Sequence, residues 1–373
     1  MKHRRYWVGG IAALVLAGAV WAAAGAGASP AQEAKASKTK VTLQLKWVTQ
    51  AQFAGYYAAK AKGFYDQQGL DVSIKVGGPD ISPEQVVAGK QAEFGIDWLP
   101  SLLAQRDTGT NLVNIAQVYS RSGTTEVTWK DSGINTIKKM KGKKYGVWIL
   151  GNEFEQQAAL VKAGLDPKKD VTLVKQNFDM NAFLKREIDA ASAMTYNELA
   201  QVLETKNPKT GKLYQLSDLN VFKMSALGTG MLQDGVFVRA DWIKSKANQA
   251  TAVKFLTASL KGWAYCRDHF RECVNIVLAN GTALPKGHQT WEMNEVNALV
   301  WPNRLGVGVM DPASFKNTAN IAFNFGVIKK KASAAAYRSD LAKKAVAALK
   351  KQGVDVFGKK WKKAKVTLTE GGK

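Results

Sequence analysis

Residues 41–76, VTLQLKWVTQAQFAGYYAAKAKGFYDQQGLDVSIKV, decide the fold. Apolar and polar residues alternate over residues 41–47, which is the period of a strand with one buried face. A helix rich in small and aromatic residues follows, and the alternation returns over residues 72–76. A strand, a helix and a second strand in this order predict a βαβ unit, which binds ligands where its strands pass into loops.

Trp47 stands at the end of the first predicted strand, beside Gln50 and Gln52. An aromatic face next to amide side chains suits a flat polar molecule, because the ring stacks and the amides both donate and accept hydrogen bonds. The sequence therefore places a candidate binding site at this edge of the sheet.

Residues 1–28 have the pattern of a secretory signal peptide. A basic start is followed by an apolar run from Trp7 to Val20 and by the small residues Ala26, Gly27 and Ala28. This predicts cleavage near Ala28 and export to the periplasm. The alternative is an uncleaved anchor, but the run is short for a membrane span.

The length and charge of the chain narrow its class. After cleavage about 345 residues remain, which is too long for one typical core and predicts two lobes. The formal charge of +23 raises the hypothesis that nucleic acid is a partner,. No helix-turn-helix, zinc or RNP pattern accompanies the lysines, which are scattered in pairs and triples. We therefore expect a solvated basic surface and no nucleic-acid binding.

Cys266 and Cys273 are the two cysteines of the chain. In one continuous helix they would lie about 10 Å apart along the axis, which is too far for a disulfide. A turn around residues 268–270 would bring them together, and export favours oxidation. We expect a structural disulfide between two helices, with a pair of buried free thiols as the alternative.

Strand and helix signals alternate from residue 90 to residue 204, and the pattern becomes almost wholly helical after residue 240. Alternation of this kind predicts an α/β fold with parallel sheets covered by helices. We expect one lobe formed by residues 39–124 and 230–373, and a second lobe formed by residues 125–229. The glycines Gly228 and Gly230 suit a hinge between them.

These features resemble the periplasmic solute-binding proteins of ABC transporters, and within them the branch that binds thiamine pyrimidine precursors and related small molecules. The resemblance covers about residues 40–330. It rests on the 41–76 stretch and on further motifs, namely Asp97-Trp98-Leu99-Pro100-Ser101, Gly146-Val147-Trp148, Gly151-Asn152-Glu153, Met194-Thr195-Tyr196-Asn197-Glu198, Asn294-Glu295 and Trp301-Pro302.

The resemblance implies a two-lobe periplasmic binding protein of type II, with a ligand cleft between the lobes. It also implies a membrane permease as partner and a monomeric protein without a cofactor. Eukaryotic relatives that synthesise the pyrimidine carry a histidine that would fall at Phe53, together with a cysteine-rich cluster. This chain has Phe53 and no such cluster, so the synthase chemistry is not supported.

Three aromatic side chains are candidates for stacking against a ligand. Trp47 and Trp98 stand at strand ends beside polar residues, and Tyr56 lies on the helix that follows the first strand. An offset-stacked aromatic pair contributes about 0.5–1.5 kcal/mol beyond area burial. The alternative for each is packing in the core.

The polar candidates fall at other predicted strand ends. Gln52 and Asp97 could bond to ring nitrogens or an exocyclic amine, although Asp97 could equally cap a helix. The turn at residues 151–153 offers Asn152 and Glu153 to a ligand, or Glu153 serves only as a favourable charge at a helix start. Further candidates are Tyr196, Asn197 and Asp234, with helix capping as the alternative for Asn197.

Enzyme chemistry has little support in the sequence. His3 lies in the signal peptide, and neither His269 nor His288 is paired with a nucleophile or grouped for a metal,. We expect a binding protein for a small planar nitrogen heterocycle, such as a thiamine-related pyrimidine. The alternatives are a small anion such as a sulfonate or nitrate, bound at the turn around Gly151, and riboflavin. An enzyme of pyrimidine synthesis and a basic surface-interaction protein are the other classes.

Overall fold

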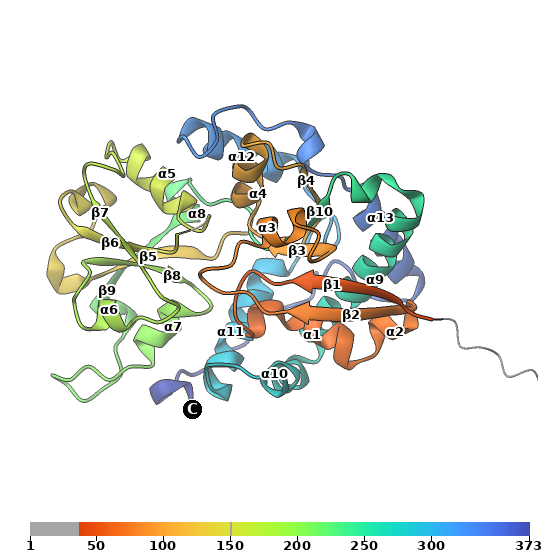
Figure 1. The fold of residues 1–373 in the computed structure, drawn as a ribbon. Coiled ribbons are helices and arrows are strands. Elements are labelled where there is room, and N and C mark those ends of the chain that lie inside the picture. The colour runs from red at the N-terminus through yellow and green to blue at the C-terminus, as the bar shows by residue number, and fades with distance from the viewer. Residues whose placement is uncertain (1–36, 150) are drawn as a thin grey trace, which may run out of the picture. The chain divides into compact units, whose positions relative to one another are not determined.

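The computed structural model describes residues 37–149 and 151–373. The signal peptide expected over residues 1–28 lies outside the described residues. Within residues 37–373 two five-stranded sheets form the frame, each with its own covering helices (Figure 1). We call the sheets with their helices the first and the second lobe.

The first sheet has the order β2-β1-β3-β10-β4. Strands β2, β1 and β3 run parallel, whereas β10 is antiparallel to both β3 and β4. Its strands are β1 (Thr39–Gln44), β2 (Leu70–Lys75), β3 (Phe94–Asp97), β4 (Leu112–Gln117) and β10 (Gly235–Arg239).

The second sheet repeats this plan in the order β7-β6-β8-β5-β9. Strand β6 is parallel to β7 and β8, and β5 is antiparallel to β8 and β9. Its strands are β5 (Thr124–Trp129), β6 (Lys144–Val147), β7 (Thr172–Lys175), β8 (Ala190–Met194) and β9 (Leu219–Lys223). The mixed α/β class expected from the sequence is confirmed.

The helices follow the strands in both lobes. The first lobe carries α1 (Ala54–Ala61), α2 (Phe64–Gln67), α3 (Pro83–Ala88), α4 (Leu99–Asp107), α9 (Lys246–Asp268), α10 (Phe270–Ala279), α11 (Lys286–Val300), α12 (Pro312–Asn324) and α13 (Asp340–Lys351). The second lobe carries α5 (Phe154–Lys162), α6 (Asn181–Leu184), α7 (Glu198–Leu203) and α8 (Met224–Leu227). Two short 3-10 helices matter for the site, η1 (Ala51–Phe53) and η7 (Glu370–Gly372).

Local sequence explains several of these elements. Helix α12 begins where Asp311 caps the first turn by accepting a hydrogen bond from the backbone N–H of Ala313, with Pro312 at the first helical position,. Helices α1 and α9 cross at a glycine contact, since a Cβ added to Gly262 would lie 1.9 Å from the carbonyl oxygen of Gly55. A larger residue at position 262 would therefore push α1 away from α9.

The chain passes between the sheets twice, after β4 and again before β10. The two crossing segments are tied together by Gln233, which is fully buried. Its side-chain carbonyl accepts from the N–H of Gly123 at 2.8 Å, and its amide donates to Glu155 at 2.9 Å. The lobe boundaries expected at residues 124 and 230 fall near these crossings and stay predictions.

Several elements differ from the sequence expectation. Strand β1 ends at Gln44, so Trp47 lies in the bend after the strand rather than within it. Strand β5 was not expected, because all six of its residues are buried and no alternation marks it,. Helix α13 was not singled out within the helical C-terminal region, although Leu341, Ala345 and Leu349 form a regular buried stripe,.

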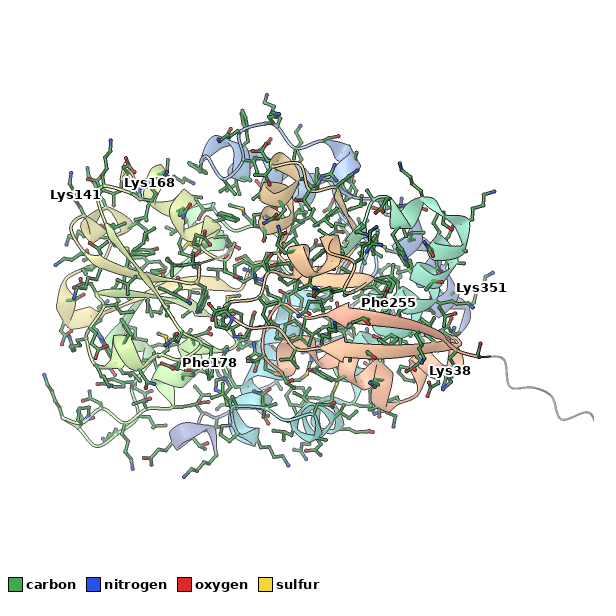
Figure 2. All side chains as sticks on the ribbon, in the orientation of Figure 1. Lys38, Lys141, Lys168, Phe178, Phe255 and Lys351 are labelled. Carbon is green, nitrogen blue, oxygen red and sulfur yellow. A yellow bond between two sulfur atoms is a disulfide. The ribbon has the colours of Figure 1, made fainter. Side chains whose placement is uncertain are left out.

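Cys266 near the end of α9 and Cys273 in α10 form a disulfide with a Cα–Cα distance of 5.2 Å. The break between the helices at His269 brings them together. Most described lysines are exposed or half-buried, as Figure 2 shows for Lys141, Lys168 and Lys351, whereas Lys46 and Phe255 are buried. Within the described residues no helix is long and apolar enough to cross a membrane.

Candidate functional site

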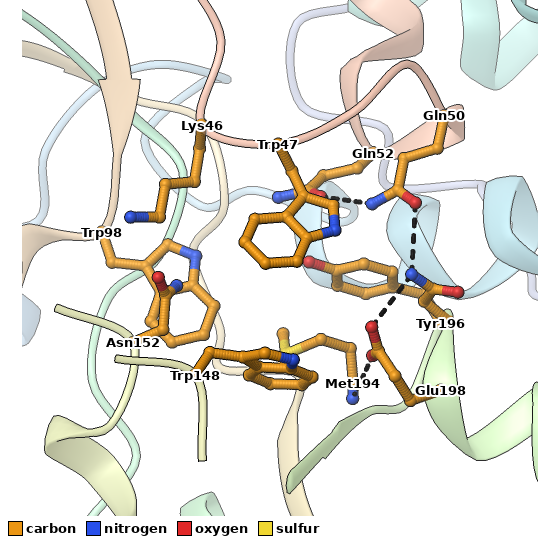
Figure 3. Close-up of a pocket in the computed structure, with 11 residues that line it drawn as sticks. Lys46, Trp47, Gln50, Gln52, Trp98, Trp148, Asn152, Met194, Tyr196 and Glu198 are labelled. Atoms are coloured by element: carbon orange, nitrogen blue, oxygen red, sulfur yellow. Dashed lines mark hydrogen bonds between the residues drawn. The ribbon is translucent and has the colours of Figure 1, made fainter. Parts of the chain in front are cut away.

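A narrow pocket with a cavity volume of about 20 Å³ lies between the two lobes (Figure 3). It is built at the ends of parallel strands: by residues 46–52 after β1, Trp98 after β3, Trp148 and Asn152 after β6, and residues 194–198 at the end of β8. Carboxyl ends of parallel strands are where open α/β sheets bind ligands. Its lining residues are Lys46, Trp47, Gln50, Gln52, Trp98, Trp148, Asn152, Met194, Tyr196, Asn197 and Glu198.

Aromatic side chains from both lobes form the walls. Trp47 of the first lobe meets Trp148 of the second edge-on, with ring centroids 6.4 Å apart and an interplanar angle of 68°. The Trp148 indole N–H donates to the carbonyl of Asn177 at 3.0 Å, which fixes that ring. Tyr196 and Trp98 complete the walls (Figure 3). The walls thus offer several flat apolar faces to a planar molecule.

Asp234 fixes two of the lining side chains without lining the pocket itself. One carboxyl oxygen accepts from the Trp98 indole N–H and the other from the Gln52 amide, both at 2.9 Å. Burial raises the pKa of Asp234 to about 7, although the bonds from Gln52 and Trp98 act in the opposite direction. Asp234 therefore holds an aromatic wall and an amide in fixed positions.

Asn197 connects the polar residues on one side of the pocket through four hydrogen bonds. Its amide nitrogen donates to Gln50 at 3.2 Å and to Glu198 at 3.1 Å, and its amide oxygen lies 2.9 Å from the Gln201 nitrogen and 3.0 Å from Nε2 of His288. An amide offers two donors and two acceptor positions, so the protein itself satisfies all four. Asn197 therefore orients its neighbours and has no remaining capacity for a ligand.

Glu198 places a buried carboxyl at the same side. Its Oε2 accepts from the backbone N–H of Met194 at 3.0 Å, and its Oε1 accepts from Asn197. Burial raises the pKa of Glu198 to about 8, against the effect of its backbone hydrogen bonds. Burial therefore favours the neutral carboxyl of Glu198, which can donate one hydrogen bond and accept another.

Lys46 brings a cation to the opposite side, but its charge is compensated inside the protein. Its ammonium lies 3.1 Å from the carboxylate of Asp97, and both side chains are buried. Burial and the nearby Glu84 raise the pKa of Asp97 well above its usual range, and Lys46 opposes that rise. Burial alone would lower the pKa of Lys46, but Asp97, Glu84 and Glu153 outweigh it and raise the pKa.

Asn152 carries the clearest unused hydrogen-bonding group of the lining. It is 4% exposed, and its side-chain oxygen has no hydrogen-bond partner among the described residues. A buried acceptor without a partner costs about 1–3 kcal/mol, so a bound donor would relieve it. The adjacent Glu153 instead accepts from the N–H of Gly151 at 2.9 Å and stands at the start of α5.

The structure gathers only some of the predicted site residues. Trp47, Gln52, Trp98, Asn152, Tyr196 and Asn197 line the pocket. The other four lie outside the lining: Tyr56, Asp97, Glu153 and Asp234. Tyr56 packs edge-on against Trp263 in the core, and Asp97 pairs with Lys46, while Glu153 and Asp234 hold neighbouring groups.

Four lining residues were not among the predicted contacts: Lys46, Trp148, Met194 and Glu198. Gln50 also lines the pocket, as its position beside Trp47 at the candidate site suggested. Trp148 and Glu198 follow strand ends, so the rule that selected Trp47 and Trp98 could have found them. Lys46 occupied a polar position of the predicted strand, and nothing in the sequence indicated its burial against Asp97.

Groups for catalysis are sparse around the pocket. The described residues contain no group of three or more His, Cys, Asp or Glu side chains that could hold a metal ion. His269 stacks on Tyr265 away from the lining. Phe53, at the position expected for a histidine in the synthases, is fully buried.

Comparison with known proteins identifies the group to which this sequence is similar. A sequence model of a family described as NMT1/THI5 like matches residues 50–272. A Haemophilus influenzae protein named for thiamine biosynthesis is 24% identical over 72% of this chain and 80% of its own length. The riboflavin-binding protein RibY of Chloroflexus aurantiacus is 24% identical over 64% of this chain and 65% of its own length.

Enzymes also occur among the relatives. The 4-amino-5-hydroxymethyl-2-methylpyrimidine phosphate synthase of Schizosaccharomyces pombe is 23% identical over 41% of this chain and 44% of its own length. The relatives therefore include both a binding protein and a synthase, and similarity alone does not decide between the two.

Solved structures establish the fold. The nitrate-binding protein NrtA of Synechocystis superimposes with a TM-score of 0.63 at 14% identity, covering 86% of this chain and 92% of that protein. The alkanesulfonate-binding protein SsuA of Xanthomonas axonopodis has a TM-score of 0.60 at 13% identity, covering 82% and 99%. The desulfurization enzyme DSZB has a TM-score of 0.54 at 12% identity, covering 83% and 99%. The two-lobed periplasmic binding-protein fold expected from the sequence is confirmed.

Proposed function

This chain belongs to the NMT1/THI5-like family, and we propose that it is the exported solute-binding protein of an ABC importer. Its ligand is a small planar nitrogen heterocycle related to the pyrimidine half of thiamine. The two lobes close over the ligand, and the closed form docks on a membrane permease as a monomer.

One observation carries the proposal: aromatic rings surround a buried carboxyl, Glu198, in a pocket between the lobes. An aminopyrimidine edge presents a ring nitrogen that accepts and an exocyclic amine that donates. A neutral carboxyl matches that edge with one donor and one acceptor. The unpartnered oxygen of Asn152 gives a second donor on the ligand a place to bind.

A small anion fits these groups less well. Lys46 is the cationic side chain of the lining, and it is already paired with Asp97. A sulfonate or nitrate would also lie near the carboxyl of Glu198, and a buried anion without a compensating cation is costly. The expected anion position at the turn around Gly151 is occupied by the carboxylate of Glu153, which accepts the N–H of Gly151.

Riboflavin is the second candidate, because one relative is named for binding it. The aromatic walls would suit a flavin ring, but the cavity of about 20 Å³ is about the size that holds one water molecule. Either ligand therefore needs the lobes to open, and a single substituted six-membered ring needs less additional space than a three-ring flavin with its sugar-alcohol chain.

A thermal-shift screen of the mature protein tests the proposal. At a hundredfold excess over the dissociation constant a ligand adds about 2.7 kcal/mol to the free energy of unfolding, which corresponds to roughly 4 °C for a protein of this length. We expect such a shift with 4-amino-5-hydroxymethyl-2-methylpyrimidine. A shift with nitrate or sulfonates alone would overturn the ligand, and conversion of the recovered pyrimidine to a product would overturn the binding role.

A further inference from the structure

His288 lies on α11 of the first lobe and reaches into the second lobe. Its side chain is fully buried. Its Nε2 lies 3.0 Å from the amide oxygen of Asn197, and its Nδ1 lies 2.8 Å from Oε2 of Glu204. Both partners belong to the second lobe, at the start and the end of α7. The contact therefore forms only while α11 and α7 are together.

Helix α11 is also fixed to the first-lobe loop of the pocket. Gln289 accepts the backbone N–H of Ala51 at 2.7 Å, and Glu292 accepts the backbone N–H of Gln52 at 3.1 Å. The same helix thus holds the loop that carries Gln50 and Gln52, and places His288 against Asn197. A movement of α11 relative to α7 would disturb both sides of the polar network together.

The hydrogen bonds around Asn197 determine where the protons on His288 lie. The Asn197 nitrogen donates to Gln50 and Glu198, so its oxygen is the atom that faces His288. Nε2 of His288 must therefore carry a proton. Nδ1 and the Glu204 carboxyl then need one further shared proton, because two acceptors would otherwise face each other at 2.8 Å.

The C-terminal segment of the described chain packs over this pair. The N–H of Gly371 donates to the backbone carbonyl of Glu204 at 2.9 Å. A Cβ added to Gly372 would lie 2.7 Å from Cβ of His288. Earlier in the same segment, the backbone of Ala364 exchanges two hydrogen bonds with the side chain of Asn294 on α11. The segment thus covers the histidine and crosses from α11 to α7.

We propose that His288, together with Glu204, is a positioning residue that determines ligand specificity. By holding the amide of Asn197, it aims the carboxyl of Glu198 and the amide of Gln50 at the polar edge of the ligand. This inference rests on the proposed function of the pocket. It makes recognition of the ligand edge depend on the approach of α11 to α7, which links specificity to closure of the lobes.

Three variants separate positioning from simple packing. His288→Phe keeps a ring but removes both hydrogen bonds. Glu204→Leu removes the partner of Nδ1, whereas Glu204→Gln retains a bond, because its amide N–H can donate to Nδ1 of a neutral histidine that still donates from Nε2. If His288→Phe does not fold, the comparison of Glu204→Leu with Glu204→Gln separates positioning from packing, because Leu and Gln are similar in size.

The readout is discrimination between two probes, measured by calorimetry. One is 4-amino-5-hydroxymethyl-2-methylpyrimidine, and the other is the same molecule without its 4-amino group. Wild-type protein should prefer the amino form by roughly tenfold or more, the effect of a hydrogen bond to a carboxyl group. In His288→Phe and Glu204→Leu the preference should fall to about threefold or less, and Glu204→Gln should keep it.

A loss of packing alone would weaken the binding of both probes equally and leave the ratio of their affinities unchanged. An unchanged ratio in Glu204→Leu, with wild-type protein that discriminates, overturns the inference and leaves the proposed function intact. Wild-type protein that binds both probes equally overturns the inference and also the recognition of the amino edge by Glu198, while the role as a binding protein stands. Wild-type protein that binds neither probe overturns the proposed function, and the inference with it.

Discussion

Trp47→Ala tests the aromatic walls of the pocket most directly. The side chain is 6% exposed, lines the pocket and contacts Trp148 across the cleft. One stacked ring contributes about 0.5–1.5 kcal/mol beyond area burial. Covering roughly 40 Å² of apolar ligand surface adds about 1 kcal/mol at about 25 cal/mol per Å². Together these predict pyrimidine binding that is roughly tenfold to seventyfold weaker.

The assay is a calorimetric titration with the pyrimidine, accompanied by thermal melting. Truncation of a buried Trp costs stability as well, by about 3–5 kcal/mol in a packed core. Trp129→Ala is the matched control, because Trp129 is 3% exposed, stacks on Phe183 with centroids 4.7 Å apart, and does not line the pocket. It should lower the melting temperature without changing the affinity. A Trp47→Ala protein that binds within about threefold of wild type would refute the role of that ring.

Three further predictions concern other groups. Asn152→Ala should not lower stability, because it removes a buried acceptor without a partner, and should weaken pyrimidine binding about threefold to tenfold in calorimetry,. Full affinity would exclude it from the site. Burial raises the pKa of Glu198 to about 8 and that of Asp234 to about 7, so native protein holds protons that the unfolded chain releases from about pH 4 upward. Their stabilising effect is complete below that pH and is lost by about pH 8. The melting temperature of the protein without added ligand should therefore fall from pH 5 to 9, and Glu198→Gln should flatten this fall. A melting temperature that rises over this range would contradict the raised pKa values. Replacing Cys266 and Cys273 by Ser should cost about 2–3 kcal/mol in denaturant unfolding with unchanged affinity, and equal stability would show that the disulfide does not stabilise the native state.

The sequence predicted the features that depend on local order along the chain. The alternation of strands and helices indicated the α/β class, and the ends of predicted strands located Trp47, Trp98, Asn152 and Tyr196. Parallel strands place their carboxyl ends at one edge, so position along the chain was enough to bring these residues to one pocket.

The remaining features depend on contacts between distant segments. Nothing near His288 in the sequence indicates that it bonds to Asn197, because these residues are 91 positions apart. Asp234 is 182 positions from Gln52, and its role in holding that amide follows from the antiparallel return of β10 beside β3. Tyr56 was predicted to contact the ligand because its helix follows the pocket loop, but its ring packs against Trp263 of α9.

A crystal structure of the mature protein saturated with 4-amino-5-hydroxymethyl-2-methylpyrimidine would test the central claim most directly. The account predicts the ring between the indoles of Trp47, Trp98 and Trp148, with its amino edge on Glu198 and closed lobes. A ring bound elsewhere, or a pocket that remains empty at saturating concentration, would contradict it.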